Sequence, residues 1–479
     1  MPAPTTPRSI AIVGGGVAGL AAAHRLTELA PACAWTLYES TDRLGGVLQT
    51  TQDGPWRIEH SADNFLTRDP WATNLCQRVG LTDELLPTNT DRRGAMVIHR
   101  GRPVRVPKGF VLMSARPVWP TLASPLLSVG AKLRLMSEPF APRGPGTDES
   151  VADFARRRLG REALERLVQP LVGGIYTADP ERLSMAATLP QFLEQEREHG
   201  SLWRAGRKQA TAKSKRESGA NYALFMAPRL GLHQLVDAIV ARLPLERLRP
   251  ATKVSGCQRT NAGRWRVRTT ADQPPAEYDA IIVATPTHHA ATLLNDASRP
   301  LSAALGRIEY ASSAVVCLGV ADTQVARPAD AFGFVVPTVE DRRIVAASFS
   351  SYKFPDRAPA GHTLVRVFVG GAMQPELAEL PDEQLIDLAV DELSDLVGLR
   401  GKPLLTRVVR WPRAMPQYHV GHLDRIGEIE QMADELGGLA LVGAGYRGVG
   451  VPQCIRSGER AAERLLQREA VCTPEPPTS

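Results

Sequence analysis

The sequence predicts an α/β protein with a doubly wound nucleotide-binding domain, an inserted antiparallel-sheet domain and a helical domain. Three observations predict this class. A glycine-rich strand–turn–helix pattern occupies residues 9–26, a second one occupies residues 439–466, and residues 296–429 between them contain a series of short β-prone runs. A chain of 479 residues is longer than one compact core, so several domains are expected.

The composition is that of an ordinary globular protein, with 43% hydrophobic and 23% charged residues. The six cysteines show no paired spacing, which predicts neither a zinc site nor a disulfide framework and favours a reducing compartment. The N-terminal residues lack the apolar core of a secretion signal, and the sequence has no run of about 18 apolar residues. We therefore expect a cytoplasmic protein without a bound metal.

The net charge of +6 is mildly basic. This balance favours acidic ligands or an anionic membrane surface, and it fits an arginine-rich proteome equally well. Much of the excess lies in residues 197–219, which show almost no apolar periodicity. We interpret that stretch as a solvated loop and expect no nucleic-acid partner.

The first glycine pattern has the spacing of a dinucleotide-binding turn. Gly14, Gly16 and Gly19 follow the apolar residues 10–13 in the order G-x-G-x-x-G, and a helical periodicity follows them. Gly14 would make the tight turn, Gly16 would admit a pyrophosphate, and Gly19 would let the helix pack against the strand. The helix N-terminus would then offer free N–H groups to the phosphates. The predicted cofactor-binding residues here are Gly14, Gly15, Gly16, Val17, Ala18 and Gly19.

The next predicted strand favours a flavin dinucleotide. It ends in Glu39, 20 residues after Gly19, where a carboxylate is expected to accept hydrogen bonds from a ribose, and Ser40 follows. Arg43 and the pair Gly45–Gly46 complete an E-x-x-x-R-x-G-G pattern. Enzymes that use FAD commonly carry this pattern, whereas dehydrogenases that use only a nicotinamide have no need of it. FAD is therefore favoured over NAD.

The second glycine pattern predicts a further contact with the same cofactor. Its turn and helix would lay backbone N–H groups beside the pyrimidine edge of the flavin, where the helix dipole stabilises negative charge. We expect cofactor contacts at Ala444, Val449, Gly450 and Val451. The alternative is an ordinary C-terminal helix packed on a sheet. Cys454 lacks the S-G-G-C surroundings of a covalent flavin link, so no such link is expected.

The middle of the chain predicts two further domains. Residues 91–210 suggest broken helices with an apolar face and basic edges, which would either seat on a membrane surface or form a buried helical subdomain. Residues 296–429 predict an antiparallel substrate sheet. The expected organisation is an FAD-binding domain of 1–90, 226–295 and 430–479, a helical, membrane-associating domain of 91–210, and a substrate-binding domain of 211–225 and 296–429.

Four segments, 173–185, 332–359, 409–422 and 445–458, together resemble the oxygen-dependent protoporphyrinogen/coproporphyrinogen oxidase family, and the resemblance runs over almost the whole chain. It implies a fold similar to that of monoamine oxidases. It also implies the six-electron oxidation of a porphyrinogen to a porphyrin by FAD and O2, with release of H2O2. It further implies cofactor contacts at Val47, Ser61, Ala62, Asp63, Asn64, Val254 and Trp411, and a substrate contact at Gly174.

One departure from the family concerns the substrate. Ala95 occupies the position where plant and animal members carry an arginine that pairs with a propionate, and Arg92 and Arg93 lie nearby. The departure leans toward a roomier pocket, as four propionates need more cationic or hydrated space. We expect protoporphyrinogen IX as the main substrate and coproporphyrinogen III as the alternative. No catalytic side chain is assigned, and we interpret His288 and His289 as surface residues rather than metal ligands.

Two other functions stay open at this point. One is an amine oxidase or carotenoid desaturase of the same superfamily, and the other is a non-catalytic, flavin-dependent membrane scaffold. The expected partners are a porphyrinogen and O2. A peripheral contact with the inner face of the cell membrane and a homodimer are left open.

Overall fold

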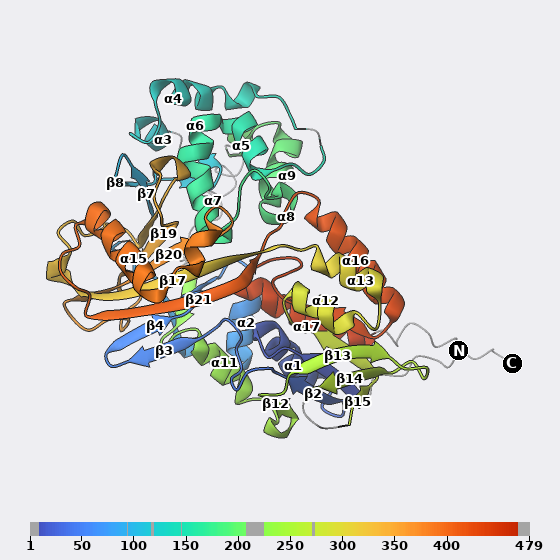
Figure 1. Ribbon diagram of the computed structural model, residues 1–479. Helices are drawn as coiled ribbons and strands as arrows, with labels where there is room; N and C mark the ends of the chain where they lie inside the picture. Colours follow the sequence, from blue (N-terminus) through green and yellow to red (C-terminus); the bar gives the residue numbers. More distant parts are fainter. Residues whose placement is uncertain are drawn as a thin grey trace.

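The computed structural model describes residues 9–92, 94–115, 119–144, 146–206, 225–270 and 274–467. Figure 1 shows the nucleotide-binding domain at the bottom of the view, a large sheet beside and above it, and the helical domain at the top. From residue 207 onward, the predicted solvated loop lies outside the described residues, as does segment 211–225 except for its last residue.

A five-stranded parallel sheet forms the core of the nucleotide-binding domain, in the order β12-β2-β1-β16-β22. Its strands are β1 (Ser9–Val13), β2 (Ala34–Tyr38), β12 (Leu248–Arg249), β16 (Ala280–Val283) and β22 (Leu439–Leu441). The side chains of Ile10 and Ile12 enter the core on one face, and those of Ala11 and Val13 enter the core on the other. Because both faces are covered, β1 is a continuous apolar run.

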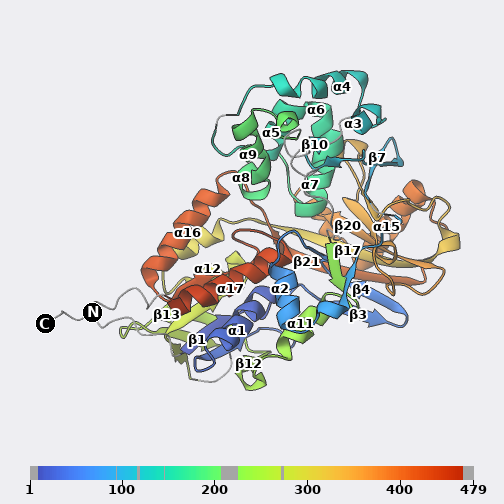
Figure 2. The same cartoon turned by 180° about the vertical axis from the view of Figure 1, so that it is seen from behind.

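Helices from distant parts of the chain cover the two faces. One face carries α1 (Val17–Leu29), α2 (Trp71–Arg78), α11 (His233–Val240) and α17 (Val451–Gln467). The other carries the antiparallel strands β13 (Val254–Arg259), β14 (Trp265–Thr269) and β15 (Ala276–Tyr278), with α12 (Thr287–Leu294), α13 (Arg299–Gly306) and α16 (His422–Leu436). Helices α1 and α17 lie side by side (Figure 2), and a Cβ at Gly458 would lie 2.0 Å from the Ala18 carbonyl oxygen. The two helices can therefore pack this closely only because residue 458 is a glycine without a side chain.

The second sheet has seven strands, in the order β21-β17-β20-β19-β18-β7-β8. The strands are β7 (Met96–His99), β8 (Arg102–Arg105), β17 (Tyr310–Ala321), β18 (Gly333–Val335), β19 (Ala346–Phe349), β20 (His362–Gly370) and β21 (Leu405–Pro416). Helix α15 (Asp382–Val397) packs on one face, and the hairpin of β3 (Thr50–Asp53) and β4 (Trp56–Glu59) packs on the other. The strands expected within 296–429 are all present, and they pair antiparallel.

Two segments lie outside the domains expected for them. Residues 96–105 were expected in the helical domain, but β7 and β8 join the seven-stranded sheet, where β7 runs parallel to β18. Helices α13 and α16 begin within the range expected for the substrate domain, but their side chains Leu301 and Ile426 belong to the nucleotide-binding core. Each element must bury its apolar side against another layer, and the sequence pattern does not show which layer that is.

The helical domain consists mainly of short helices. They are α3 (Trp119–Ala123), α4 (Val129–Met136), α5 (Val151–Leu159), α6 (Arg161–Ala163), α7 (Gln169–Tyr176), α8 (Met185–Thr188) and α9 (Pro190–His199), with the 3-10 turn η2 (Glu138–Phe140), the π-helical turn η3 (Leu164–Val168) and the hairpin of β9 (Phe110–Val111) and β10 (Ser114–Ala115). Smaller elements complete the fold: β5 (Phe65–Leu66), β6 (Leu85–Pro87), β11 (Phe225–Pro228), α14 (Ser350–Lys353), η1 (Thr82–Glu84), η4 (Leu245–Arg247), η5 (Asp322–Gln324), η6 (Thr338–Glu340) and η7 (Pro375–Glu379).

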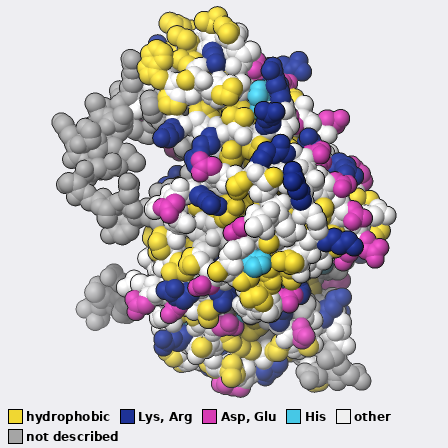
Figure 3. Space-filling model, turned by 90° about the vertical axis from the view of Figure 1, so that its left-hand side faces the viewer, with side chains coloured by type: hydrophobic (Ala, Val, Ile, Leu, Met, Phe, Trp, Pro, Cys, Tyr) yellow, Lys and Arg dark blue, Asp and Glu magenta, His cyan; other side chains and the backbone are white. Residues whose placement is uncertain are grey.

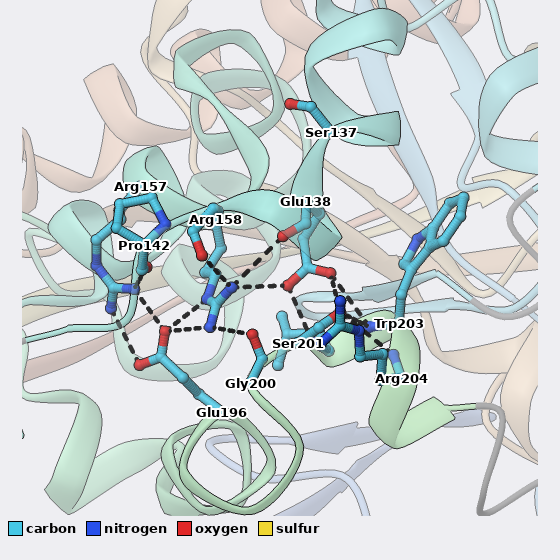
Figure 4. Close-up of polar contacts among 12 residues, drawn as sticks. Ser137, Glu138, Pro142, Arg157, Arg158, Glu196, Gly200, Ser201, Trp203 and Arg204 are labelled. Atoms are coloured by element: carbon cyan, nitrogen blue, oxygen red, sulfur yellow. Dashed lines mark hydrogen bonds and ion pairs between the residues drawn. The ribbon is translucent and has the colours of Figure 1, made fainter.

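A buried ion-pair network holds the helical domain together (Figure 4). Arg158 of α5 is fully buried, and its guanidinium lies 3.3 Å from the Glu138 carboxylate and 2.5 Å from that of Glu196 on α9. Glu138 also accepts the backbone N–H of Leu202 at 2.9 Å. Buried charges are tolerated only when they are paired and hydrogen-bonded, as they are here.

An apolar patch lies on the outer face of the same domain. Phe140 is 84% exposed, Val129 74% and Trp119 72%, and Leu133 and Met136 lie exposed beside Val129 on α4. Figure 3 shows apolar side chains gathered at this end of the molecule. The domain also has a core of its own, in which Leu167 and Val168 of η3 are fully buried. It is therefore a packed helical subdomain, and its exposed apolar patch leaves the predicted membrane contact as a prediction.

Candidate functional site

The first glycine turn connects β1 to α1 as the spacing predicts. Gly14 has a φ of +111°, and a Cβ there would lie 2.6 Å from the Ala284 carbonyl oxygen. A Cβ at Gly19 would lie 2.0 Å from the Gly14 carbonyl oxygen, which explains the need for glycine in the helix. At Gly16 the nearest atom would be the Cα of Gly46, at 4.0 Å, so space is open beside the turn.

This turn fits the pyrophosphate of a dinucleotide. Gly16 is the N-cap of α1, and no side chain caps that helix end. The first N–H groups of a helix have no intrahelical acceptor, and together with the dipole they favour a negatively charged group. The open space at Gly16 lies at this same helix end. Val17 and Ala18, the remaining residues predicted here, form its first turn.

Glu39 lies directly beside the turn. One carboxylate oxygen accepts the Gly15 N–H at 2.8 Å, and the other accepts the Thr41 N–H at 2.9 Å and the Ser40 hydroxyl at 3.1 Å. The Glu39 carbonyl oxygen accepts the Thr252 N–H at 2.7 Å, which brings the chain leading into Val254 to the same place. The structure therefore groups the acidic residue, the first turn and the start of β13.

The glycine pair after Glu39 crosses over the first turn. Gly45 donates its N–H to the Gly15 carbonyl oxygen at 2.8 Å and forms a bridge with Gly16. The Arg43 guanidinium donates to the Gly46 carbonyl oxygen at 2.5 Å. The glycine pair of the E-x-x-x-R-x-G-G pattern therefore lies against the first turn, next to the N-terminus of α1.

The segment 60–64 lies between the nucleotide-binding domain and the seven-stranded sheet. The Trp411 indole N–H donates to the His60 carbonyl oxygen at 2.8 Å, so Trp411 lies directly beside this segment. The Ser61 hydroxyl donates to the carbonyl oxygen of Val47, whose side chain is 46% exposed. Ala62 is exposed next to Ser61.

Asp63 is buried, and two cations hold it in place. The ammonium of Lys353 lies 2.8 Å from its carboxylate, and the guanidinium of Arg366 lies 3.3 Å away. Burial opposes ionisation of Asp63, but the two cations outweigh it and lower the pKa of the carboxyl. Asn64 donates to the other carboxylate oxygen at 2.6 Å. Sequence reasoning singled out Asp63 but missed Lys353 and Arg366, which lie about 300 residues further along the chain.

The second glycine turn connects β22 to α17. Because β22 runs parallel to β16, and β16 to β1, this turn and the first one lie at the same edge of the sheet. Gly443 has a φ of +113° and no atom within 4 Å of a Cβ built there, and Gly448 has a φ of +141°. The turn residues Ala444, Val449 and Gly450 are half-buried, and Val451 begins α17.

Two residues that follow β21 contact the second turn, and the sequence analysis assigned no role to either. The hydroxyl of Tyr418 donates to the Ala444 carbonyl oxygen and accepts the Gly448 N–H at 2.9 Å. The ring of His422 stacks on Tyr418 at 4.0 Å. Both belong to the segment 409–422, which carried part of the family resemblance, and that was the only signal for them.

The residues expected near the substrate are placed as follows. Gly174 is exposed near the end of α7, and a Cβ there would lie 3.0 Å from the Val335 side chain on β18. The Arg92 guanidinium lies 4.0 Å over the ring of Tyr352. Ala95 lies just before β7, and Arg93 lies outside the described residues. Arg92 is therefore a cation three residues before Ala95, the position at which the family resemblance implies an arginine.

Other reactive side chains lack the setting of a catalytic group. Burial and the neighbouring His289 and Arg413 lower the pKa of His288 to about 4, and His288 packs edge-on against Tyr310. Burial raises the pKa of the Cys454 thiol to about 12. Among the described residues, no group of three His, Cys, Asp or Glu side chains could hold a metal ion.

Comparisons with known proteins extend over nearly the whole chain. Residues 17–466 match the protein family described as flavin containing amine oxidoreductase. The chain is 32% identical over 467 residues to the coproporphyrinogen III oxidase of Bacillus subtilis (strain 168), covering 96% of this chain and 98% of that protein. It is 26% identical over 500 residues to protoporphyrinogen oxidase 2 of Arabidopsis thaliana, covering 97% and 95%.

Solved structures share the fold. A crystal structure from Exiguobacterium sp. 255-15, provisionally assigned as a protoporphyrinogen oxidase, superposes with a TM-score of 0.83 at 30% identity and covers 96% of this chain and 98% of that one. Cyclohexylamine oxidase from Brevibacterium oxydans IH-35A superposes with a TM-score of 0.69 at 17% identity, covering 96% and 98%. The second likeness concerns the fold alone.

Proposed function

The chain belongs to the flavin containing amine oxidoreductase family and is an FAD-dependent oxidoreductase, and from this premise we propose that it oxidises a porphyrinogen to the porphyrin with O2 as acceptor. The observation that carries the proposal is the 32% identity to a coproporphyrinogen III oxidase over nearly the full length of both chains. Cyclohexylamine oxidase, whose structure is similar, is only 17% identical, so it gives no support for an amine as the substrate.

The residues of the two glycine turns would hold the cofactor. The N-terminus of α1 would bind the pyrophosphate, Glu39 a ribose, and the 444–451 turn with segment 61–64 the flavin ring. FAD supplies the acceptor for two electrons at a time when it is bound. The chain's own task is to hold the macrocycle at the flavin and to keep the electron-rich pyrroles aligned.

The proposed reaction balances with three molecules of oxygen. The porphyrinogen loses six electrons and six hydrogens, three O2 take them up, and three H2O2 are released. One site is enough for all three rounds, because tautomerisation of the macrocycle presents the remaining bonds in turn.

We propose coproporphyrinogen III as the physiological substrate. The bacterial relatives, which are 29–32% identical, carry that name, whereas the plant relatives named for protoporphyrinogen are 26–29% identical. Protoporphyrinogen IX, the substrate favoured by the sequence analysis, is the second candidate. Ala95 stands where plant and animal members carry an arginine that pairs with a propionate. An alanine leaves a roomier pocket there, and this supports the substrate with four propionates, which need more hydrated space.

The test is a comparison of both porphyrinogens in air. Purified holoenzyme is mixed with each at fixed salt, and porphyrin fluorescence and H2O2 are followed against a sample without enzyme. We expect three H2O2 per porphyrin and a higher kcat/KM for coproporphyrinogen III. A hundredfold preference for protoporphyrinogen IX, which is about 2.7 kcal/mol in transition-state binding, would reverse the substrate assignment. No turnover of either would refute the function.

We also propose that the apolar patch of the helical domain seats on an anionic lipid surface. Three of its side chains are more than 70% exposed, and Lys132 lies on the same helix, α4. None of the helices within the described ranges is long and apolar enough to cross a membrane. Leu133→Ser should reduce sedimentation with phosphatidylglycerol vesicles, whereas Leu404→Ser, with a similar exposure of 61% against 63%, should not. Equal sedimentation of both would contradict the proposal.

A further inference from the structure

Residues 417–422 connect the helical domain to the second glycine turn. The segment follows directly after β21. The carbonyl oxygen of Tyr418 accepts the Ser184 N–H at 2.8 Å, and the N–H of Gly421 donates to the Asp148 carboxylate at 3.0 Å. These bonds fix the backbone of the segment on the helical domain. The side chains of Tyr418 and His422 in the same segment contact the nucleotide-binding domain.

The side chain of Tyr418 spans the second turn. It is 2% exposed, and its hydroxyl bonds both the Ala444 carbonyl oxygen and the Gly448 N–H. One hydroxyl can donate one hydrogen bond and accept another, so both of its functions are used. The two backbone groups lie four residues apart, and this fixes the distance across the turn.

His422 holds the middle of the same turn. Its Nε2 lies 2.8 Å from the Tyr446 carbonyl oxygen, and since a carbonyl only accepts, this nitrogen carries the proton. His422 is fully buried, and burial lowers its pKa to about 4, so the ring is neutral near pH 7. It stacks on Tyr418 with an angle of 16° between the rings. Together, the two side chains bind three backbone groups of the turn.

The turn needs such external support. Gly443 and Gly448 both have positive φ, and glycine is free to adopt many other conformations. Helix α17 begins at Val451, so a change in the turn would displace the N-terminus of that helix. Backbone N–H groups and a helix N-terminus stabilise negative charge only when they are already in position.

We propose that Tyr418 and His422 are positioning residues that set how strongly the second turn favours reduced over oxidised FAD. This inference rests on the proposed contact of Ala444 and 449–451 with the flavin ring. The helical domain, which carries Ser184 and Asp148, thereby determines a property of the cofactor through the segment 417–422.

The test is the midpoint potential of bound FAD, measured with redox dyes in the holoenzyme. Tyr418→Phe keeps the ring stack and removes both hydrogen bonds. If the preference for reduced FAD weakens tenfold, the potential falls by about 30 mV for two electrons. We expect at least this fall, together with a changed visible spectrum of the flavin. His422→Phe, which also keeps the stack, should shift the potential in the same direction and serves as the second variant.

Tyr278→Phe is the matched control. Its hydroxyl is bonded to that of Tyr38 at 2.6 Å, in the same domain but away from the second turn. It should lower the melting temperature without changing the potential. An unchanged potential in both Tyr418→Phe and His422→Phe would overturn the inference. The measurement needs no porphyrinogen, so absence of porphyrinogen turnover in the wild type would refute the proposed function and leave this inference standing.

Discussion

Replacing Glu59 by glutamine should remove a pH dependence from the stability of the protein. Glu59 ends β4 and is 1% exposed. Its carboxylate accepts the Leu232 N–H at 2.9 Å and the Thr50 hydroxyl at 2.9 Å. Burial raises the pKa of this carboxyl from 4.5 to about 7, and the two hydrogen bonds and the nearby Arg357 only partly counter it.

The sign follows from proton binding. Between pH 4.5 and 7 the folded protein holds the Glu59 proton that the unfolded chain has released, so this group's contribution to stability falls as the pH rises. Above pH 7 both states are ionised and the contribution is constant. With about 1.36 kcal/mol for each pKa unit, the loss between pH 5 and pH 8 is about 2.5 kcal/mol. Glu59→Gln resembles the protonated form and should not show this loss.

The assay is urea unfolding of wild type and Glu59→Gln at pH 5, 6, 7 and 8 with a fixed excess of FAD. Equal FAD affinity adds the same free energy to both proteins, so their difference isolates Glu59. The variant should gain stability relative to wild type as the pH rises, and the gain should level off above pH 7. Two parallel curves over this range would refute a raised pKa at Glu59.

Three further outcomes follow from the site and the helical domain. Gly16→Val should abolish FAD retention, because the added side chain would fill the space proposed for the pyrophosphate. The fold should persist, since a Cβ at Gly16 meets no atom closer than 4.0 Å. A yellow variant with a normal FAD stoichiometry would contradict this. Glu39→Ala should weaken FAD binding less severely, measured by fluorescence titration, since it removes hydrogen bonds without filling the site. Arg158→Met should lower the free energy of unfolding by about 3–5 kcal/mol, while Arg161→Met, on an exposed pair, should leave it nearly unchanged.

Local patterns predicted the parts of the site that one turn or one strand builds. The roles of Gly14 and Gly19 follow from spacing alone, because both are determined by contacts within a strand–turn–helix and the strand beside it. The strands of 296–429 were predicted for the same reason, since alternation is a property of each strand by itself. The family resemblance was confirmed by the comparisons.

Long-range pairings were beyond such patterns. Asp63 forms ion pairs with Lys353 and Arg366, which belong to other elements of the fold. The carbonyl oxygen of Ala444 accepts a hydrogen bond from Tyr418, which also lies in a distant segment. No periodicity indicates which lysine or tyrosine will meet a given carboxylate or carbonyl. The position of β7 was missed for a related reason: its parallel partner β18 lies more than 230 residues later in the chain.

The strand order of the five-stranded sheet also determines when the candidate cofactor site can form during protein synthesis. β22 pairs with β16, which pairs with β1, and α17 packs on α1. Until the residues after 438 have left the ribosome, β16 has an unpaired edge and α1 has an uncovered apolar face. During that time the edge of β16 and the apolar face of α1 are open to contact with other chains. The candidate cofactor site, which uses both glycine turns, is complete only after the last strand and helix have been made.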